Sequence, residues 1–311
     1  MTDVADLQIA GVPLEDDELL ARFLAVRNAV DARPLTLAGF RAEAVATIDH
    51  HELLATLDGA DVGAAGTGWG EIAIESKTVF IDAWVLPEAR RRGIGTRLID
   101  RCVRYARDAG MAVARSYVLD GDEGSIRFAE RYGMAVVGGG QLGALELTDQ
   151  HRRPASLPEG IAITTWAERP DLERSIYDLD VLVQPEIPTL ALEPTPSFEA
   201  WHRQLANDPG FVPGLSVIAL RDGQVVGSVI VYDNDEGNAF IGMTAVHPEA
   251  RRLGIARAMK IELAARAVEA GWRRIETYND ATNERMRGLN VELGYVYQAR
   301  HVSLKGPLPD A

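Results

Sequence analysis

The stretch PEARRRGIG at residues 87–95 returns as PEARRLGIA at residues 248–256, an offset of 161 residues. The same offset carries Gly133 onto Gly294 without a gap. A repeat of this length is far longer than one unit of a solenoid, so it indicates two copies of a whole domain.

A polar connecting segment separates the two copies. Residues 148–160 read TDQHRRPASLPEG, with two prolines and one glycine, which is typical of a connection between folded segments. We therefore expect domains at residues 1–150 and 158–311. A chain of 311 residues is long enough for each domain to bury its own core.

Both copies predict the same order of elements, namely helices, a hairpin, a third strand, a helix, a strand and a helix. The Asp-Gly pairs at 58–59 and 222–223 stand between strand-like runs, which is a strong signal for a tight hairpin. Residues 94–106 alternate apolar and arginine-rich faces at helical spacing. Helices are expected at residues 17–30, 40–48, 171–182 and 198–205, and strands at 52–57, 78–86, 112–119, 239–246 and 273–279.

Composition narrows the class of function. The formal net charge of −14 disfavours nucleic-acid partners and favours cationic ligands. The single cysteine, Cys102, excludes an internal disulfide and a cysteine-ligated zinc site. No apolar stretch approaches the length of a membrane span, and the acidic N-terminal stretch does not resemble a signal peptide. We expect a cytoplasmic protein with no membrane partner.

The most informative positions are the loops at residues 90–95 and 251–256, between an expected strand and an expected helix. Glycines there let the backbone approach a ligand, and the free amides of the first helical turn suit a phosphate. The neighbouring arginines add anion contacts. No Gly-Lys-Ser/Thr follows, and the third glycine of the dinucleotide fingerprint is missing. The alternative is a purely structural helix start, which the duplication of the pattern disfavours.

The pattern Arg-x-x-Gly-x-Gly/Ala after a strand resembles motif A of the GCN5-related N-acetyltransferases (GNAT family). In copy two the resemblance extends to residues 277–283, Asn290 and residues 293–295. Two such domains in one chain also resemble the tandem acetyltransferases that include mycothiol synthase. The resemblance implies an α/β fold of two tandem GNAT domains, each a mixed, mostly antiparallel sheet flanked by helices, with a splayed pair of parallel strands.

The resemblance also implies that both copies hold acetyl-CoA, through a strand end, the glycine loop and, in copy two, two asparagines. In copy two the implied cofactor-binding residues are Thr244, Ala245, Val246, Arg251, Arg252, Leu253, Gly254, Ile255, Ala256, Arg257, Asn279 and Asn283. In copy one they are Ala83, Trp84, Val85, Arg90, Arg91, Arg92, Gly93, Ile94, Gly95 and Thr96. Copy one carries Val118 and Asp122 in place of the two asparagines, so copy two is the expected working site and copy one a possible degenerate domain.

The catalytic groups are less well defined. Many family members have a tyrosine that protonates the leaving thiolate, and here its position holds Asn290 in copy two and Ala129 in copy one. Glu276 is the candidate general base, against the alternative of a solvent-facing strand residue. Further candidates are Tyr278, Tyr297 and His247, for which packing or surface roles are the alternative. The pair His50–His51 does not predict a metal site, because neighbouring strand residues face opposite ways.

The resemblance implies an acetyl-CoA-dependent N-acetyltransferase whose acceptor is a primary amine of a small molecule, and the acidic net charge favours a cationic acceptor. The proline-dense connection at residues 184–197 is expected to shape the acceptor pocket, unless it is only a rigid spacer. Two alternatives remain open. One is a non-catalytic acyl-CoA-binding sensor or interaction protein, and the other is an enzyme that acetylates a protein or peptide amine. The oligomeric state cannot be read from the sequence.

Overall fold

The protein forms two compact units in a computed structural model that describes residues 6–31, 34–45, 47–187, 196–235 and 237–308. Unit 1 comprises Met1–Val137 and His301–Ala311, and unit 2 comprises Gly138–Arg300. The helices and strands of unit 1 are β1 Leu7–Gly11, α1 Asp17–Val30, α2 Leu37–Val45, β2 Asp49–Leu57, β3 Ala60–Trp69, α3 Glu71–Ser76, β4 Thr78–Val85, α4 Ile94–Asp108, β5 Val113–Leu119, α5 Glu123–Glu130 and residues 301–307 of β12 Val296–Pro307.

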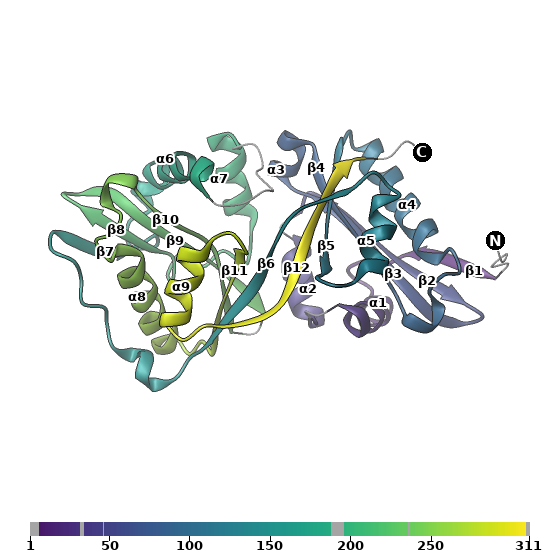
Figure 1. Cartoon of the computed structure of the whole chain (residues 1–311), viewed down its shortest axis with the longest axis horizontal. Coiled ribbons are helices and arrows are strands. Elements are labelled where there is room, and N and C mark those ends of the chain that lie inside the picture. Colours follow the sequence, from purple (N-terminus) through teal and green to yellow (C-terminus); the bar gives the residue numbers. More distant parts are fainter. Residues whose placement is uncertain (1–5, 32–33, 46, 188–195, 236, 309–311) are drawn as a thin grey trace. The chain divides into compact units, whose positions relative to one another are not determined.

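Unit 2 repeats this order of elements (Figure 1), except that its described residues include no counterpart of α3. Its helices and strands are residues 138–146 of β6 Ala135–Glu146, β7 Ile161–Thr165, α6 Glu173–Val183, α7 Phe198–Asn207, β8 Val217–Arg221, β9 Gln224–Asp235, β10 Asn238–Val246, α8 Ile255–Glu269, β11 Arg274–Asp280, α9 Glu284–Glu292 and residues 296–300 of β12.

The sheet of unit 1 runs in the order β1-β2-β3-β4-β5-β12, and that of unit 2 in the order β6-β11-β10-β9-β8-β7. Neighbours within these orders pair antiparallel, except for the parallel pairs β4–β5 and β10–β11. The predicted fold class is therefore confirmed. The predicted Asp-Gly hairpin turns are also confirmed, with φ of 51° and 81° at Asp58 and Gly59, the left-handed values that such a turn requires.

Helices cover both faces of the unit 1 sheet because successive strand residues alternate in direction. On β2, Leu53 packs in the cluster that contains Leu98 and Cys102 of α4. Its neighbour Leu54 packs in the cluster that contains Leu20 and Phe23 of α1. None of the helices in the described part of the chain is long and apolar enough to cross a membrane.

The final strand of each sequence repeat is exchanged between the units. Strand β6 pairs with β11 from Glu146↔Arg274 to Gly140↔Asp280. Strand β12, drawn in yellow in Figure 1, pairs with β5 from His301↔Leu119 to Pro307↔Val113. The compact units therefore differ from the expected domains 1–150 and 158–311, because those ranges follow the repeat while the hydrogen-bonded strands cross over at residues 137–138 and 300–301.

Candidate active site

The glycine loops of the two units have the same backbone conformation. Gly93 and Gly254 lie just before α4 and α8 with φ of 82° and 81°, and no side chain caps either helix. Arg91 and Arg252 share a φ of 64°, which is unfavourable for a residue with a side chain. The first-turn amides of each helix consequently have no intrahelical partner and are available to an anion.

Each parallel strand pair separates in front of its loop. Strands β4 and β5 pair only from Thr78↔Val113 to Phe80↔Arg115, although β4 continues to Val85 and β5 to Leu119. In unit 2 the paired part of β10 and β11 ends at Ile241↔Thr277. The splayed strand pair predicted for each domain is confirmed. In both units the backbone groups beyond the last pairs do not bond to the neighbouring parallel strand.

In unit 1 a cavity of about 390 Å³ lies beside the glycine loop. Asp122, which precedes α5, and Gly124 and Phe128 of α5 form another wall. Gly95 faces this space, since a Cβ there would already be in van der Waals contact with the Phe128 ring, at 3.6 Å. The cavity is lined by most residues predicted to bind the cofactor in copy one, namely Ala83, Val85, Arg90, Arg91, Gly93, Ile94, Gly95 and Thr96.

The two remaining residues predicted in copy one lie elsewhere. Arg92 is exposed at the surface. Trp84 faces a second cavity of about 150 Å³, and its indole Nε1 donates a hydrogen bond to Asp31 at 2.9 Å. This second cavity adjoins the first, because Ala83, Asp122 and Phe128 line both.

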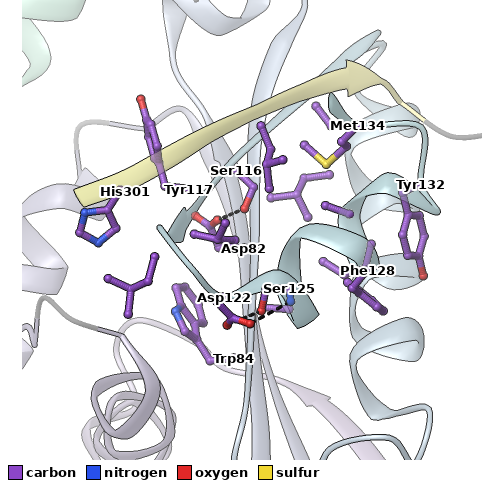
Figure 2. A pocket seen from close by; sticks show the side chains of 18 of the residues that line it. Asp82, Trp84, Ser116, Tyr117, Asp122, Ser125, Phe128, Tyr132, Met134 and His301 are labelled. Carbon is purple, nitrogen blue, oxygen red and sulfur yellow. Dashed lines mark hydrogen bonds between the residues drawn. The ribbon is translucent and has the colours of Figure 1, made fainter. Parts of the chain in front are cut away.

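Acidic and aromatic side chains converge in the second cavity (Figure 2). Asp82 reaches it from β4, Tyr117 from β5 and His301 from β12. Its lining residues include the carboxylates of Asp31, Asp82 and Asp122, and no lysine or arginine among the described residues. The cavity is therefore suited to a cationic or amine-bearing ligand.

Asp82 has the properties of a proton acceptor. Its Oδ1 accepts a hydrogen bond from the Ser116 hydroxyl at 2.6 Å (Figure 2). Burial raises the pKa of Asp82 to about 6, although the hydrogen bonds from Ser116 and the Tyr117 backbone act in the opposite direction. At neutral pH the carboxylate is thus ionised in most molecules, with more basicity than an exposed aspartate has.

A second buried acid, Glu52 on β2, lies close enough to Asp82 for the charge of Asp82 to raise the pKa of Glu52. Glu52 is 9% exposed, and a Cβ at Gly66 would clash with its Oε2, so the glycine makes room for the carboxyl group. Burial raises the pKa of Glu52 to about 8, against the influence of Arg27. Glu52 is therefore protonated at neutral pH.

Glu52 should make the stability of the protein pH-dependent. The folded state retains a proton on Glu52 up to a pKa of about 8, whereas the unfolded state releases it near 4.5, so this contribution is present at low pH and is lost as pH rises through 8. We expect Glu52→Gln to stabilise the protein by about 3 kcal/mol at pH 8 and to have little effect at pH 4.5. Urea unfolding at the two pH values measures this, and an equal effect at both would contradict the assignment.

In unit 2 the loop arginines are engaged within the protein. Arg251 pairs with Glu186, and its Nε donates to the Val246 carbonyl at 3.2 Å. Arg257 pairs with Glu292 at 2.9 Å. Of the other predicted residues there, Thr244, Ala245 and Val246 end β10, Leu253 is exposed, and Ile255 is buried as the first residue of α8.

The asparagines that favoured copy two bind neighbouring residues instead. Asn283 caps α9, where its side chain accepts the Met286 amide at 3.3 Å. Asn279 Oδ1 accepts hydrogen bonds from Asn290 Nδ2 at 2.7 Å and from the Tyr297 hydroxyl at 2.6 Å. Asp122, the counterpart of Asn283 in unit 1, caps α5 in the same way, so which copy is the working site stays a prediction.

The two candidate catalytic residues of copy two also have structural partners. Asn290 is fully buried, so in this conformation its side chain does not reach a ligand. Glu276 is 8% exposed, pairs with Arg274 at 3.0 Å and lies in the paired part of β11. Asn290 thus belongs to a buried hydrogen-bond network with Asn279 and Tyr297, and Glu276 is paired with an arginine; their catalytic roles stay predictions.

Asn290→Ala tests the structural role and introduces the residue that copy one has at this position, Ala129. We expect the free energy of unfolding to fall by about 2 kcal/mol, because a buried hydrogen bond and its packing are lost. We expect kcat per folded molecule to stay within twofold. Urea unfolding and an activity assay at saturating substrate measure the two quantities, and a large loss of kcat in a stable variant would restore the catalytic assignment.

The remaining candidates have packing or turn roles. His247 Nδ1 accepts the Glu249 amide at 3.3 Å. His51 stacks on Tyr105 with ring centroids 3.9 Å apart. Among the described residues, no group of three or more His, Cys, Asp or Glu side chains could hold a metal ion. Most of the proline-dense connection expected to shape the acceptor pocket, residues 188–195, lies outside the described residues.

Comparisons with known proteins agree with this geometry. The family model described as "Acetyltransferase (GNAT) family" matches residues 28–134 and 175–295. A search of curated proteins found no match. The chain is similar in structure to a GCN5-related N-acetyltransferase from Sphaerobacter thermophilus, with a TM-score of 0.78, 20% identity and coverage of 99% of this chain and 97% of the other.

A second similar structure is a tandem GNAT protein from the clavulanic acid biosynthesis pathway, with a TM-score of 0.73, 20% identity and coverage of 98% and 99%. A third is a putative acetyltransferase from Pyrococcus horikoshii, with a TM-score of 0.60, 15% identity and coverage of 97% and 90%. At these identities the likeness shows the fold. It extends over both units of the chain.

Proposed function

Because this chain belongs to the acetyltransferase (GNAT) family, we propose that it transfers the acetyl group of acetyl-CoA to a primary amine of a small molecule, with unit 1 as the working site. One observation carries the proposal. In unit 1 a cavity beside the glycine loop adjoins a cavity lined by carboxylates, and both reach the gap between β4 and β5. A donor and an acceptor bound in these cavities would meet at the strand gap.

The first cavity fits the cofactor in shape and charge. The free amides at residues 94–96 and the side chains of Arg90 and Arg91 would hold the diphosphate. The separated end of β4, at Ala83 and Val85, would pair with the extended pantetheine arm. Bound acetyl-CoA supplies the acyl thioester that a neutral amine attacks.

The second cavity would receive the acceptor. A primary amine carries a proton near neutral pH, and the carboxylates of Asp31 and Asp82 favour that cation. We assign Asp82 as the general base, which removes the proton directly or through one water. Trp84 and Tyr117 add flat apolar walls, so the acceptor should bear an apolar or ring-shaped portion next to its amine.

A second role follows for unit 2. It retains the uncapped helix start and the splayed strands, while Asn279, Asn283, Arg251 and Arg257 have partners within the protein. We propose that the loop of unit 2 binds acetyl-CoA, through residues 244–246 and 251–257, without catalysing transfer. Unit 2 would then have the role of a non-catalytic acyl-CoA-binding sensor, while unit 1 would be the enzyme.

A coupled assay of free thiol release tests the function. Purified protein with acetyl-CoA is offered diamines, amino sugars and aromatic amines, and separately peptides with free N-termini and lysines. We expect amine-dependent thiol release with small amines. Release with peptides alone would support the protein acetyltransferase alternative, and cofactor binding without release across the whole panel would support a non-catalytic protein.

A further inference from the structure

Lys260 is an unusual residue in the core of unit 2. It lies on the buried side of α8 with 2% of its surface exposed. Among the residues that the structure describes, its ammonium nitrogen has no hydrogen-bond partner, and its nearest aromatic neighbour is the Tyr295 ring, with the centroid 5.4 Å away. A buried charge without a partner is strongly disfavoured, and burial lowers the pKa of Lys260 to about 7.

The lysine lines a cavity of about 200 Å³, here called the Lys260 cavity. Lys260, Ile261 and Ala264 of α8 form one wall, and Tyr295, whose hydroxyl has no partner among the described residues, forms another. The segment of residues 150–156 closes the opposite side. Two unpartnered polar groups, an ammonium and a hydroxyl, therefore border one space.

The charged surroundings of the Lys260 cavity are positive. His151 and Arg153 line it, and the amide of Thr148 donates to His151 Nδ1 at 3.0 Å, so a neutral His151 ring carries its proton on Nε2. No carboxylate lines this cavity among the described residues. An adjoining cavity, which shares His151, contains Glu146 and Glu292.

Both of those acids already have arginine partners. Glu146 pairs with Arg274 at 3.4 Å, and Glu292 pairs with Arg257 at 2.9 Å. Neither is therefore free to neutralise Lys260. An anion from outside the chain would therefore be needed to stabilise the charged form of Lys260.

The fold itself does not require a lysine here. By the offset of 161 residues, copy one has Ile99 at the position of Lys260 and Met134 at that of Tyr295. Two apolar residues therefore occupy the equivalent positions in unit 1. The ammonium and the hydroxyl are specific to unit 2, which favours a role in binding over a role in folding.

We propose that the Lys260 cavity binds a small monocarboxylate, whose carboxylate pairs with the Lys260 ammonium and accepts a hydrogen bond from the Tyr295 hydroxyl. Gln150 and Ser156 also line the cavity, but the side formed by α8 and the neighbouring residues is apolar, namely Leu145, Ile261, Ala264 and Leu293. A short aliphatic tail therefore suits the site better than a phosphate, which has no apolar part. The site is separate from both glycine loops.

Carbon NMR of the wild-type chain tests this directly, because the protein has only three lysines, Lys77, Lys260 and Lys305. With ¹³C-labelled lysine, the Lys260 side-chain resonance is followed through a pH titration with and without butyrate. We expect butyrate to raise the proton affinity of Lys260 about tenfold, since the anion stabilises the charged form. The signals of His151, Arg153 and Tyr295 should be monitored as the other groups facing the cavity.

Calorimetry supplies the matched comparison. We expect butyrate to bind with uptake of protons at pH 7.5, the uncharged analogue butyramide to bind at least tenfold more weakly, and Lys260→Ile to abolish binding while keeping the fold. Lys77→Gln, at an exposed position, should leave binding unchanged, and Tyr295→Phe should weaken it severalfold.

Several results would overturn the proposal. They are an unchanged Lys260 titration in butyrate, equal binding of butyrate and butyramide, or tighter binding of phosphate than of butyrate. The titration on the wild-type protein decides the matter even if Lys260→Ile does not fold. The Lys260 cavity is lined by residues of unit 2, whereas the proposed active site is in unit 1. Loss of acetyl transfer in a unit 1 variant would therefore not change the result of the butyrate titration.

Discussion

Gly95→Leu is expected to reduce kcat/KM for acetyl transfer at least 100-fold. Gly95 lies in the first turn of α4, and even a Cβ there would stand 3.6 Å from Phe128 and 3.7 Å from Val85. A leucine side chain would therefore fill the cavity in which the diphosphate should lie. Because Gly95 has a helical backbone and not a left-handed one, the substitution should not strain the fold. Calorimetric titration with acetyl-CoA and steady-state kinetics measure the effect.

The repeat provides a matched control for this variant. Ala256 occupies the same position in unit 2, and Ala256→Leu should block that loop in the same way. We expect Ala256→Leu to remove one bound acetyl-CoA per chain while leaving more than half of the transfer activity. The reverse result, with activity lost in Ala256→Leu and kept in Gly95→Leu, would move the working site to unit 2.

Asp82→Asn is expected to lower kcat by 100- to 1000-fold, the usual cost of removing a general base. The asparagine side chain has nearly the same shape and keeps a carbonyl oxygen for the Ser116 hydroxyl, so binding of acetyl-CoA should change little. Kinetics at saturating acetyl-CoA separate the two effects. Retention of more than half of the wild-type kcat would exclude Asp82 as the base.

The pH profile gives an independent test of Asp82. The carboxylate must be ionised to accept a proton, so wild-type activity should fall as pH drops below the pKa of about 6. In Ser116→Ala this limb should move to higher pH, because the hydroxyl that lowers the pKa is gone. An acid limb that stays at the same pH in Ser116→Ala would show that another group controls it.

The sequence predicts much of the fold because its signals are local. The Asp-Gly pairs specify hairpins, and the repeated glycine loops predict the junctions of strand and helix that the structure contains at Gly93 and Gly254. The helix predicted at residues 17–30 has those bounds in the structure. The splayed strands were predicted from the resemblance to the GNAT family and not from these local signals.

The exchange of β6 and β12 could not be predicted in this way. A strand shows the same alternation of apolar and polar residues whichever copy of a repeated sheet it joins, and both copies offer an equivalent edge at β5 and β11. The strand exchange also brings His301 of β12 into the second cavity of unit 1, so the sequence could not place this residue at the site either. Asp82 was overlooked because it lies inside an apolar strand, TVFIDAWV, although an acid within such a run is itself a signal.

The expectation that copy two is the working site depends on asparagines, and the sequence alone does not define what an asparagine side chain binds. Asn279, Asn283 and Asn290 fit the family pattern by position, but an asparagine can bind a cofactor, cap a helix or join a buried network equally well. Sequence spacing does not show which of these a side chain does. The structure shows contacts with Tyr297 and with the first turn of α9.

A crystal structure with acetyl-CoA measures the central claim most directly. The account predicts the diphosphate on the amides of residues 94–96 and the thioester between the separated ends of β4 and β5, with its carbonyl carbon open to the cavity that contains Asp82. A cofactor bound only in unit 2, with its thioester beside Glu276 and the unit 1 cavity filled by side chains, would contradict it.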